Sequence, residues 1–343
     1  MNLKSNIRQS NFELLRIVCM YNILLYHLLF HGCNGLQLIP SVSKVSVVVE
    51  AFLFFHVNAF LLISGYFGIR FHFKSLLKFI LPCAFYSVLI YLLFEWSGDH
   101  LNSINIKGLL KRFAFICRDS PWWFVEKYFY LFLTAPIFNI ALKYSKKREL
   151  QIILVLLLLV NIGIGGVMHS DFNRNGFCYN HFVLMYMLGG YIARFGIEFK
   201  SSRLILGYIF TSILIVLPPH IVRGYVNPFV IIQAICVFLL FEKMRFQSRR
   251  INYLAASTFS VYLIHDEDVY SRPFLRVMVA NFYSLFSSDW CFLLGLIIVS
   301  IIAFISLIFA DKLFKYTIVD RLYNMFNCCY NNLKTRSKLW VHL

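Results

Sequence analysis

Residues 152–160 read IILVLLLLV, an apolar run from Ile152 to Val160 that contains no charge and no alternation of polar and apolar positions. A strand of a membrane barrel would alternate, so the run predicts a helix. Backbone groups surrounded by lipid must bond within their own segment, which also favours helices. Similar runs recur along the chain, which is 59% hydrophobic and only 14% charged, whereas a soluble domain is about 25% charged. The sequence therefore predicts an all-α integral membrane protein.

We predict about ten transmembrane helices in one bundle with a polar internal cavity, taking about 20 residues as the length that crosses a bilayer. The apolar blocks cover residues 13–31, 47–67, 76–96, 123–142, 151–168, 180–196, 204–219, 228–242, 254–282 and 291–314. Asp266, Glu267 and Asp268 interrupt the ninth block, so we expect a short or bent element there. No long linker and no repeat of roughly 20–50 residues divides the sequence, which predicts a single domain over residues 1–343.

The basic residues predict the orientation in the membrane, because Lys and Arg concentrate in cytoplasmic loops. Of the 33 Lys and Arg residues, 22 fall in the N-terminal segment, in alternate loops and in the C-terminal segment, and 9 fall in the other loops. We therefore expect both termini in the cytoplasm, with residues 317–343 as a short basic tail. The net charge of +17 resides mainly in these segments, and no separate basic and aromatic module indicates a nucleic-acid partner.

The cysteines carry no recognisable metal or disulfide pattern. All nine are scattered, without a CxxC pair and without the His and Cys spacing that is typical of zinc sites. We expect no structural disulfide and no bound metal.

Three ionisable residues lie in or near the first apolar block, where such groups are costly and are candidates for function. Glu13 lies three residues before Arg16 and can pair with it. His27 follows Arg16 by eleven residues, about three helical turns or roughly 16 Å, so both lie on nearly the same face. A histidine can take a proton from a hydroxyl near neutral pH. The alternative stays open that Arg16 reaches the lipid headgroups and that His27 only stabilises the bundle.

A second candidate site is a basic cluster at the expected cytoplasmic end of the third block. Arg70, Lys74 and Lys78 follow one another in steps of four, which places them on one face if the segment is helical. Such a surface suits a phosphate-bearing donor such as coenzyme A. Ordinary anchoring by positive charges is the alternative.

A third candidate site lies at the start of the fourth block, where Trp123 and Glu126 are candidates for binding an acceptor. A carboxylate that enters a membrane helix needs a partner. Lys127 is adjacent in sequence and does not face Glu126, so we expect the partner to come from elsewhere. The alternative is that both residues are interfacial anchors.

A fourth candidate site ends an apolar run and contains Tyr262, His265 and Asp266. A His and Asp pair in this position can contact the acceptor or support the bundle. The pair alone does not distinguish between these roles.

Four stretches, in the same order along the chain, resemble the membrane acyltransferase-3 family of bacterial glycan O-acetyltransferases. Arg16, in NFELLR at 11–16, is followed by His27, which is similar to the family's Arg-x10-His signature. The other stretches are FLLISGY at 60–66, the pattern of Trp123, Phe124, Tyr128, Pro136 and Asn139, and TFSVYLIHD at 258–266. Together they cover most of the chain, so their combination is more specific than any one of them.

The resemblance implies an enzyme of the bacterial inner membrane, with an acyl-coenzyme A donor, a carbohydrate acceptor and no permanently bound cofactor. It implies His27 as the catalytic histidine and Arg16 as its essential companion near the donor. Glu13 and the other candidates named above are assigned to substrate binding. The family's Arg-x-x-Arg motif after the second helix is replaced here by Lys74 and Lys78, which lack the bidentate fork of arginine.

The leading hypothesis is therefore transfer of an acyl group, acetyl in the first instance, from coenzyme A to a hydroxyl of a lipid-linked or surface polysaccharide. His27 would activate the hydroxyl directly or carry the acyl group. One alternative is a transporter or flippase for lipid-linked sugar, although the sequence lacks the symmetric pair of broken helices typical of transporters. A polysaccharide polymerase or glycosyltransferase would generally present larger outer loops or a nucleotide-sugar domain.

Overall fold

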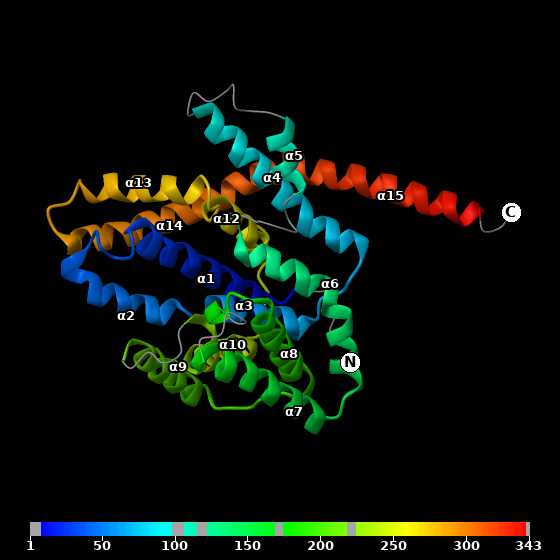
Figure 1. Ribbon diagram of the computed structural model, residues 1–343, viewed down its shortest axis with the longest axis horizontal. Helices are drawn as coiled ribbons and strands as arrows, with labels where there is room; N and C mark the ends of the chain where they lie inside the picture. The colour runs from blue at the N-terminus through cyan, green and yellow to red at the C-terminus, as the bar shows by residue number, and fades with distance from the viewer. Residues whose placement is uncertain (1–7, 98–105, 115–121, 169–173, 218–223, 341–343) are drawn as a thin grey trace.

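The computed structural model describes residues 8–97, 106–114, 122–168, 174–217 and 224–340, and these residues contain no strand. The α-helices are α1 (Ser10–His27), α2 (Ser43–Leu53), α3 (His56–Phe67), α4 (Phe73–Ser97), α5 (Ile106–Ala114), α6 (Trp123–Tyr144), α7 (Lys147–Leu158), α8 (Tyr179–Phe195), α9 (Ser201–Val216), α10 (Pro228–Lys243), α11 (Arg249–Ala255), α12 (Thr258–His265), α13 (Ser271–Tyr283), α14 (Asp289–Phe314) and α15 (Asp320–Trp340) (Figure 1). Short 3-10 or π-helical segments are η1 (Leu28–Gly32), η2 (Pro40–Val42), η5 (Leu159–Val167), η6 (Arg174–Gly176), η7 (Gly224–Val226) and η8 (Lys315–Val319). The predicted all-helical fold is confirmed for the described part of the chain.

Five helical stretches in the described residues are long and apolar enough to cross a membrane. They are Ser10–Gly32, Pro40–Phe67, Phe73–Ser97, Lys147–Val167 and Asp289–Asn331. Several other helices, such as α9 with 16 residues, are shorter than the roughly 20 residues that span a bilayer without adjustment. The chain is therefore a helical protein with several helices fit to cross a membrane, and the count of ten stays a prediction.

The ninth predicted block is broken, as the three acidic residues in it led us to expect. The helix α12 ends at His265, residues 266–270 are not helical, and α13 starts at Ser271. Glu267 stabilises this break, because its Oε2 accepts hydrogen bonds from the backbone N–H groups of Val269 at 3.0 Å and Tyr270 at 2.6 Å. A side-chain oxygen that satisfies free N–H groups at a helix start is a helix cap. The break thus has a local physical cause and leaves the end of α12 inside the molecule.

The second predicted block is also divided, which the sequence analysis did not anticipate. The helix α2 ends at Leu53 and α3 begins at His56, and the two residues between them form a turn with helical backbone angles. His56 therefore occupies the first turn of a helix that starts in the interior, where its side chain is 1% exposed.

Close packing of α1, α3 and α8 forms the centre of one half of the bundle. A Cβ atom added to Gly65 would lie 1.9 Å from the carbonyl oxygen of Tyr186, and one added to Gly189 would lie 2.2 Å from that of Leu62. These glycines let the backbones of α3 and α8 touch, as small residues do between membrane helices. On α1, the ring of Phe12 lies 5.0 Å from that of Tyr66. This packing fixes α1, which carries both Arg16 and His27.

The C-terminal helix α15 extends away from the rest of the bundle (Figure 1). It covers most of the predicted tail at 317–343, which is therefore largely helical. Its cytoplasmic location stays a prediction.

Candidate active site

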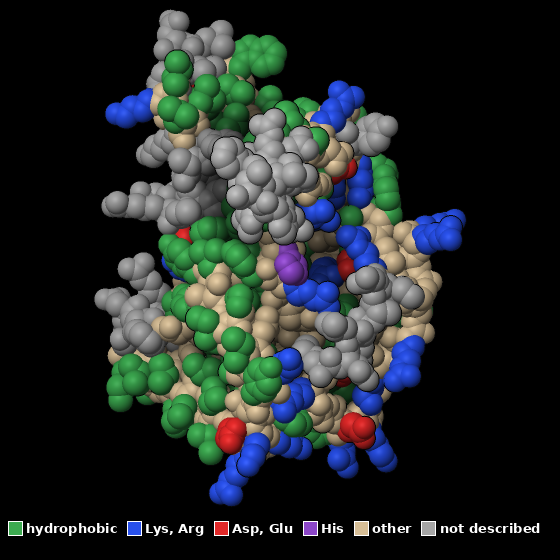
Figure 2. Space-filling view, turned by 90° about the vertical axis from the view of Figure 1, so that its right-hand side faces the viewer, with side chains coloured by type: hydrophobic (Ala, Val, Ile, Leu, Met, Phe, Trp, Pro, Cys, Tyr) green, Lys and Arg blue, Asp and Glu red, His purple; other side chains and the backbone are tan. Residues whose placement is uncertain are grey.

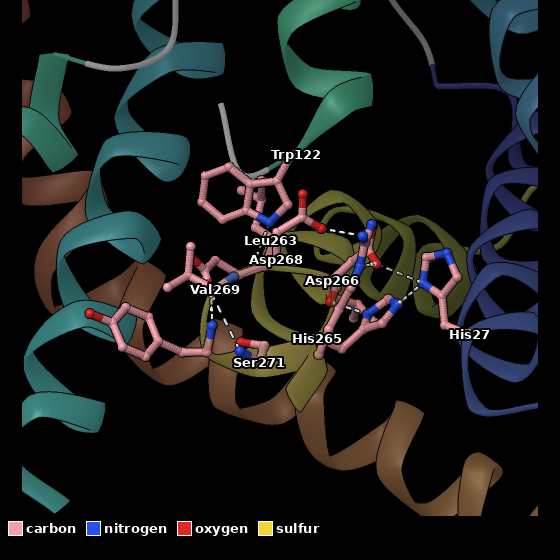
Figure 3. A network of polar contacts seen from close by, with 12 residues as sticks. His27, Trp122, Leu263, His265, Asp266, Asp268, Val269 and Ser271 are labelled. Carbon is pink, nitrogen blue, oxygen red and sulfur yellow. Dashed lines mark hydrogen bonds and ion pairs between the residues drawn. The ribbon is translucent and has the colours of Figure 1, made fainter. Parts of the chain in front are cut away.

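His27 lies at the end of α1, where the end of α12 meets it inside the bundle. Its side chain is buried, and its Nδ1 lies 3.1 Å from Nε2 of His265 and 3.1 Å from Oδ1 of Asp266. Figure 3 shows the three side chains pointing toward one another from these two segments. The structure thus unites His27 of the first candidate site with His265 and Asp266 of the fourth.

Arg272, at the start of α13, holds the carboxylate of Asp266. Its Nε donates to Oδ1 at 2.7 Å and its second terminal nitrogen donates to Oδ2 at 3.0 Å, while its other terminal nitrogen pairs with Asp268. Asp266 is fully buried, and a buried carboxylate requires both a countercharge and hydrogen bonds. The bidentate contact provides both, so Asp266 is an ionised acceptor in the interior. The sequence analysis did not single out Arg272, although its position six residues after Asp266 was visible.

The hydrogen bonds determine which nitrogen of His27 carries the proton. Nδ1 of His265 lies 2.6 Å from the carbonyl oxygen of Val261 and must donate to it, which leaves Nε2 of a neutral His265 as an acceptor. This Nε2 accepts the hydrogen bond from Nδ1 of His27 at 3.1 Å, and Oδ1 of Asp266 lies at ion-pair distance from the same Nδ1. Neutral His27 consequently has its lone pair on Nε2. This is the arrangement of a histidine base whose proton position is set by a hydrogen-bond partner, with a buried carboxylate beside it.

A cavity of about 60 Å³ adjoins His27. Its lining is mainly aromatic and aliphatic, and its polar members include His27, His56 and Tyr262. Met20 and Ile23 also line it, and together with Arg16 and His27 they follow one another along α1 in steps of four, three and four. Residues with this spacing share one helix face, so the cavity lies on the face of α1 that carries Arg16. The polar internal cavity that we expected from the sequence stays a prediction.

The predicted pair of Glu13 and Arg16 is present. A terminal nitrogen of Arg16 lies 2.5 Å from Oε1 of Glu13, and the side chains are 30% and 9% exposed. Arg16 is thus charged and partly exposed. It lies on the same helix as His27, eleven residues earlier, and does not contact it. Its role as the companion of His27 stays a prediction.

The basic cluster of the second candidate site is exposed but does not lie on a single helix. Arg70 precedes α4, whereas Lys74 and Lys78 lie in the first turns of that helix. The expected common helix face is therefore wrong for Arg70, because the helix begins three residues after it. Lys78 lies over the ring of Tyr323 on α15, with Nζ 5.5 Å from the ring centroid.

A second basic feature lies where α8 ends, α9 begins and α10 ends. A hollow of about 560 Å³ is lined there by Lys200, Arg203, Lys243 and Arg245, together with Glu198 and Glu242. Figure 2 views the side of the molecule on which α15 projects in Figure 1, and Lys and Arg side chains are numerous on this face. Tyr66, at the end of α3, donates to Glu242 at 2.8 Å and ties the hollow to α3. The sequence analysis counted these basic residues only as topology signals.

The third candidate site is divided by the structure. Trp123 lines the cavity next to His27, and its ring lies 5.8 Å from that of Tyr225. Glu126 does not belong to that lining. Its Oε1 lies 2.9 Å from Nζ of Lys127, so the expectation of a partner from elsewhere is wrong. A long lysine side chain in the first turn of α6 reaches its neighbour although the two Cα positions face different directions. Tyr262, from the fourth site, does line the cavity.

One group of side chains has metal-like spacing. His27, His31 and Asp266 each place one potential ligand atom within 4.8 Å of the others. Arg272 already binds both carboxylate oxygens of Asp266, and its positive charge opposes a cation at the same place. We therefore assign no metal to this group.

Comparisons with known proteins give one match. A family model described as an acyltransferase domain, of the acyltransferase-3 type, matches residues 9–309. Searches of curated proteins and of solved structures found no match. The matched range contains every candidate site residue named above.

Proposed function

Since this chain belongs to the acyltransferase-3 family, we propose that it moves an acetyl group from acetyl-coenzyme A to a hydroxyl of a lipid-linked or surface polysaccharide at the bacterial inner membrane. Family membership supports the general activity, acyl transfer by a membrane protein, and it lends nothing to the transporter or polymerase alternatives. The observation that carries the proposal is His27, whose Nδ1 lies 3.1 Å from the buried Asp266 and whose ring borders a cavity.

The proposed reaction is a direct transfer. The acceptor oxygen attacks the thioester carbonyl carbon while its proton moves to Nε2 of His27. The negative charge of Asp266, whose Oδ1 lies 3.1 Å from Nδ1 of His27, stabilises the resulting imidazolium. The carbonyl electrons move onto oxygen and return when the bond between carbon and sulfur breaks. The departing thiolate takes the proton from Nε2 of His27, which leaves an ester, free coenzyme A and neutral His27.

The donor would approach from the basic face. Coenzyme A carries phosphates, which favour clustered Arg and Lys side chains, and the hollow provides four of them. Arg16 lies near the N-terminal end of α1, between that end and the cavity, and on the same helix face as His27. The proposed path therefore runs along α1, with the phosphates at the hollow and the thioester at the cavity.

Removing charge from the hollow is expected to weaken donor binding. The double variant Arg203→Gln with Arg245→Gln should raise KM for acetyl-coenzyme A about tenfold, because each lost charge-assisted hydrogen bond is worth about 1.5–3 kcal/mol before solvent screening. The kcat should stay unchanged, since neither residue lies at the cavity. Steady-state kinetics with purified protein in lipid vesicles measures both constants.

A donor without nucleotide phosphates is the control for this experiment. The acetyl thioester of N-acetylcysteamine should be used equally well by the wild type and by the double variant. The parallel variant Lys74→Gln with Lys78→Gln tests the second basic cluster in the same assay. An unchanged KM for acetyl-coenzyme A in the hollow variant would contradict this donor site.

The function itself is tested with radiolabelled acetyl-coenzyme A and vesicles that contain the purified protein and lipid-linked oligosaccharide. We expect labelled, alkali-sensitive ester on the glycan and one free thiol for each ester formed. Movement of the glycan across the vesicle membrane without release of thiol would instead support a transporter. Absence of both ester and thiol release would contradict the proposal.

A further inference from the structure

The cavity beside His27 contains two polar groups whose hydrogen-bonding capacity is not used. The Nε2 atom of His56 and the hydroxyl of Tyr262 are both buried and make no hydrogen bond of full geometry within the described residues. The backbone of Phe124 lies near the Tyr262 oxygen as a potential donor, which leaves the O–H proton without an acceptor. The two side chains are 1% and 5% exposed. Burying an unsatisfied polar group costs about 1–3 kcal/mol, so two of them on residues that line one cavity indicate that a ligand binds there.

The backbone determines the protonation of His56. The N–H group of Val57 donates to Nδ1 of His56 at 2.8 Å. An imidazolium has protons on both nitrogens and could not accept this bond, so the ring is neutral. Its single proton must then lie on Nε2, which makes the unused atom a hydrogen-bond donor. The break between α2 and α3 enables this, because it places His56 at a helix start where the N–H of Val57 is not used by a preceding turn.

The cavity therefore combines two opposite kinds of group. Of the residues that line it, His27 has an unprotonated Nε2, whereas His56 has a free N–H and Tyr262 a free O–H. The rest of the lining includes Phe60, Phe124 and Phe259, which exclude water and keep the local dielectric low. In such surroundings a fixed donor stabilises developing negative charge far better than it would in water.

We propose that His56 and Tyr262 form the oxyanion-binding site of the reaction, with Nε2–H and O–H donating to the thioester oxygen as it becomes negative. This inference rests on the proposed function. When the acceptor oxygen attacks, the carbonyl electron pair moves onto that oxygen, and the two donors bind the resulting charge. When the bond to sulfur breaks, the electron pair returns to the carbonyl and the donors are released unchanged. His27 alone carries the transferred proton.

The test compares kcat and KM for acetyl-coenzyme A in four variants. His56→Leu should lower kcat about 100-fold, the usual effect of removing one oxyanion donor, with KM unchanged. His56→Gln retains an N–H donor and should be faster than the leucine variant. Tyr262→Phe should also lower kcat about 100-fold, yet its thermal unfolding temperature should stay equal or rise, because an unpartnered buried hydroxyl is removed.

Tyr21→Phe is the matched control for the tyrosine variant. Tyr21 lies on α1 outside the cavity and bonds the hydroxyl of Ser300 at 3.0 Å, so its removal should leave kcat unchanged. A wild-type kcat in His56→Leu or in Tyr262→Phe would overturn the inference alone, and so would a glutamine variant no faster than the leucine variant. A wild type that releases no thiol from acetyl-coenzyme A would overturn the proposed function and this inference together.

Discussion

Replacing His27 by alanine is expected to lower the rate of acetyl transfer about 1000-fold or more. The variant loses the base that accepts the proton of the attacking hydroxyl, an effect worth about 10²–10⁴-fold, and also the acid that protonates the departing thiolate. His27→Gln should be equally slow, because an amide is polar but does not accept a proton near neutral pH. Release of thiol from acetyl-coenzyme A and formation of glycan ester measure the loss.

The control for His27 is a buried residue of the same helix. Cys19→Ala removes a fully buried thiol of α1 that does not line the cavity, and it should keep the wild-type rate. Both variants should elute as intact protein in size-exclusion chromatography. Transfer at the wild-type rate by folded His27→Ala protein would remove His27 from the reaction.

Replacing Asp266 by asparagine is expected to lower the rate by a similar factor, about 1000-fold, without touching His27. The asparagine carries no negative charge, whereas Nε2 of His265 still accepts the hydrogen bond from Nδ1 of His27. The imidazolium formed during the reaction therefore loses its countercharge. Steady-state kinetics of the folded variant measures the effect.

The charges of Asp266 and Arg272 allow stability to be separated from catalysis. Arg272→Met alone leaves the fully buried carboxylate without its bidentate partner, which should cost about 3–5 kcal/mol. Combining it with Asp266→Asn removes both charges, so the unfolding temperature should rise again toward that of the wild type. The activity of the double variant should stay low, because the negative charge beside His27 is still absent. Recovery of activity together with stability would show that Asp266 has only a structural role.

The helical fold could be predicted from the sequence because its signal is local. Apolar runs such as residues 152–160 are continuous, and a backbone in lipid has few alternatives to a helix. The break in the ninth block was also visible, since adjacent carboxylates cannot remain in an apolar helix without partners. The break before His56 was not visible, because residues 51–55, where α2 ends, read AFLFF and are all apolar.

The site was predicted in its parts but not in its assembly. His27, His265 and Asp266 were each candidates. However, 238 positions separate His27 from His265 in the sequence, and only the packing of α12 on α1 brings them together. Arg272 and His56 were missed because their roles depend on contacts that the sequence does not show. Arg272 binds the carboxylate of Asp266, and His56 accepts a hydrogen bond from the backbone N–H of Val57. The prediction that Glu126 pairs with a residue other than Lys127 was wrong for another reason. Helix-face geometry describes Cα positions, whereas a long lysine side chain can bend back toward its neighbour.

The most direct test of the account is the protonation of His27 itself. Solid-state nuclear magnetic resonance of protein labelled with ¹⁵N-histidine in lipid distinguishes a protonated ring nitrogen from one with a free lone pair, and the His27→Gln variant assigns the signals. We predict that neutral His27 carries its proton on Nδ1, which donates to Nε2 of His265, and has an unprotonated Nε2. A proton on Nε2 of His27 in the resting wild-type protein would contradict its role as the base.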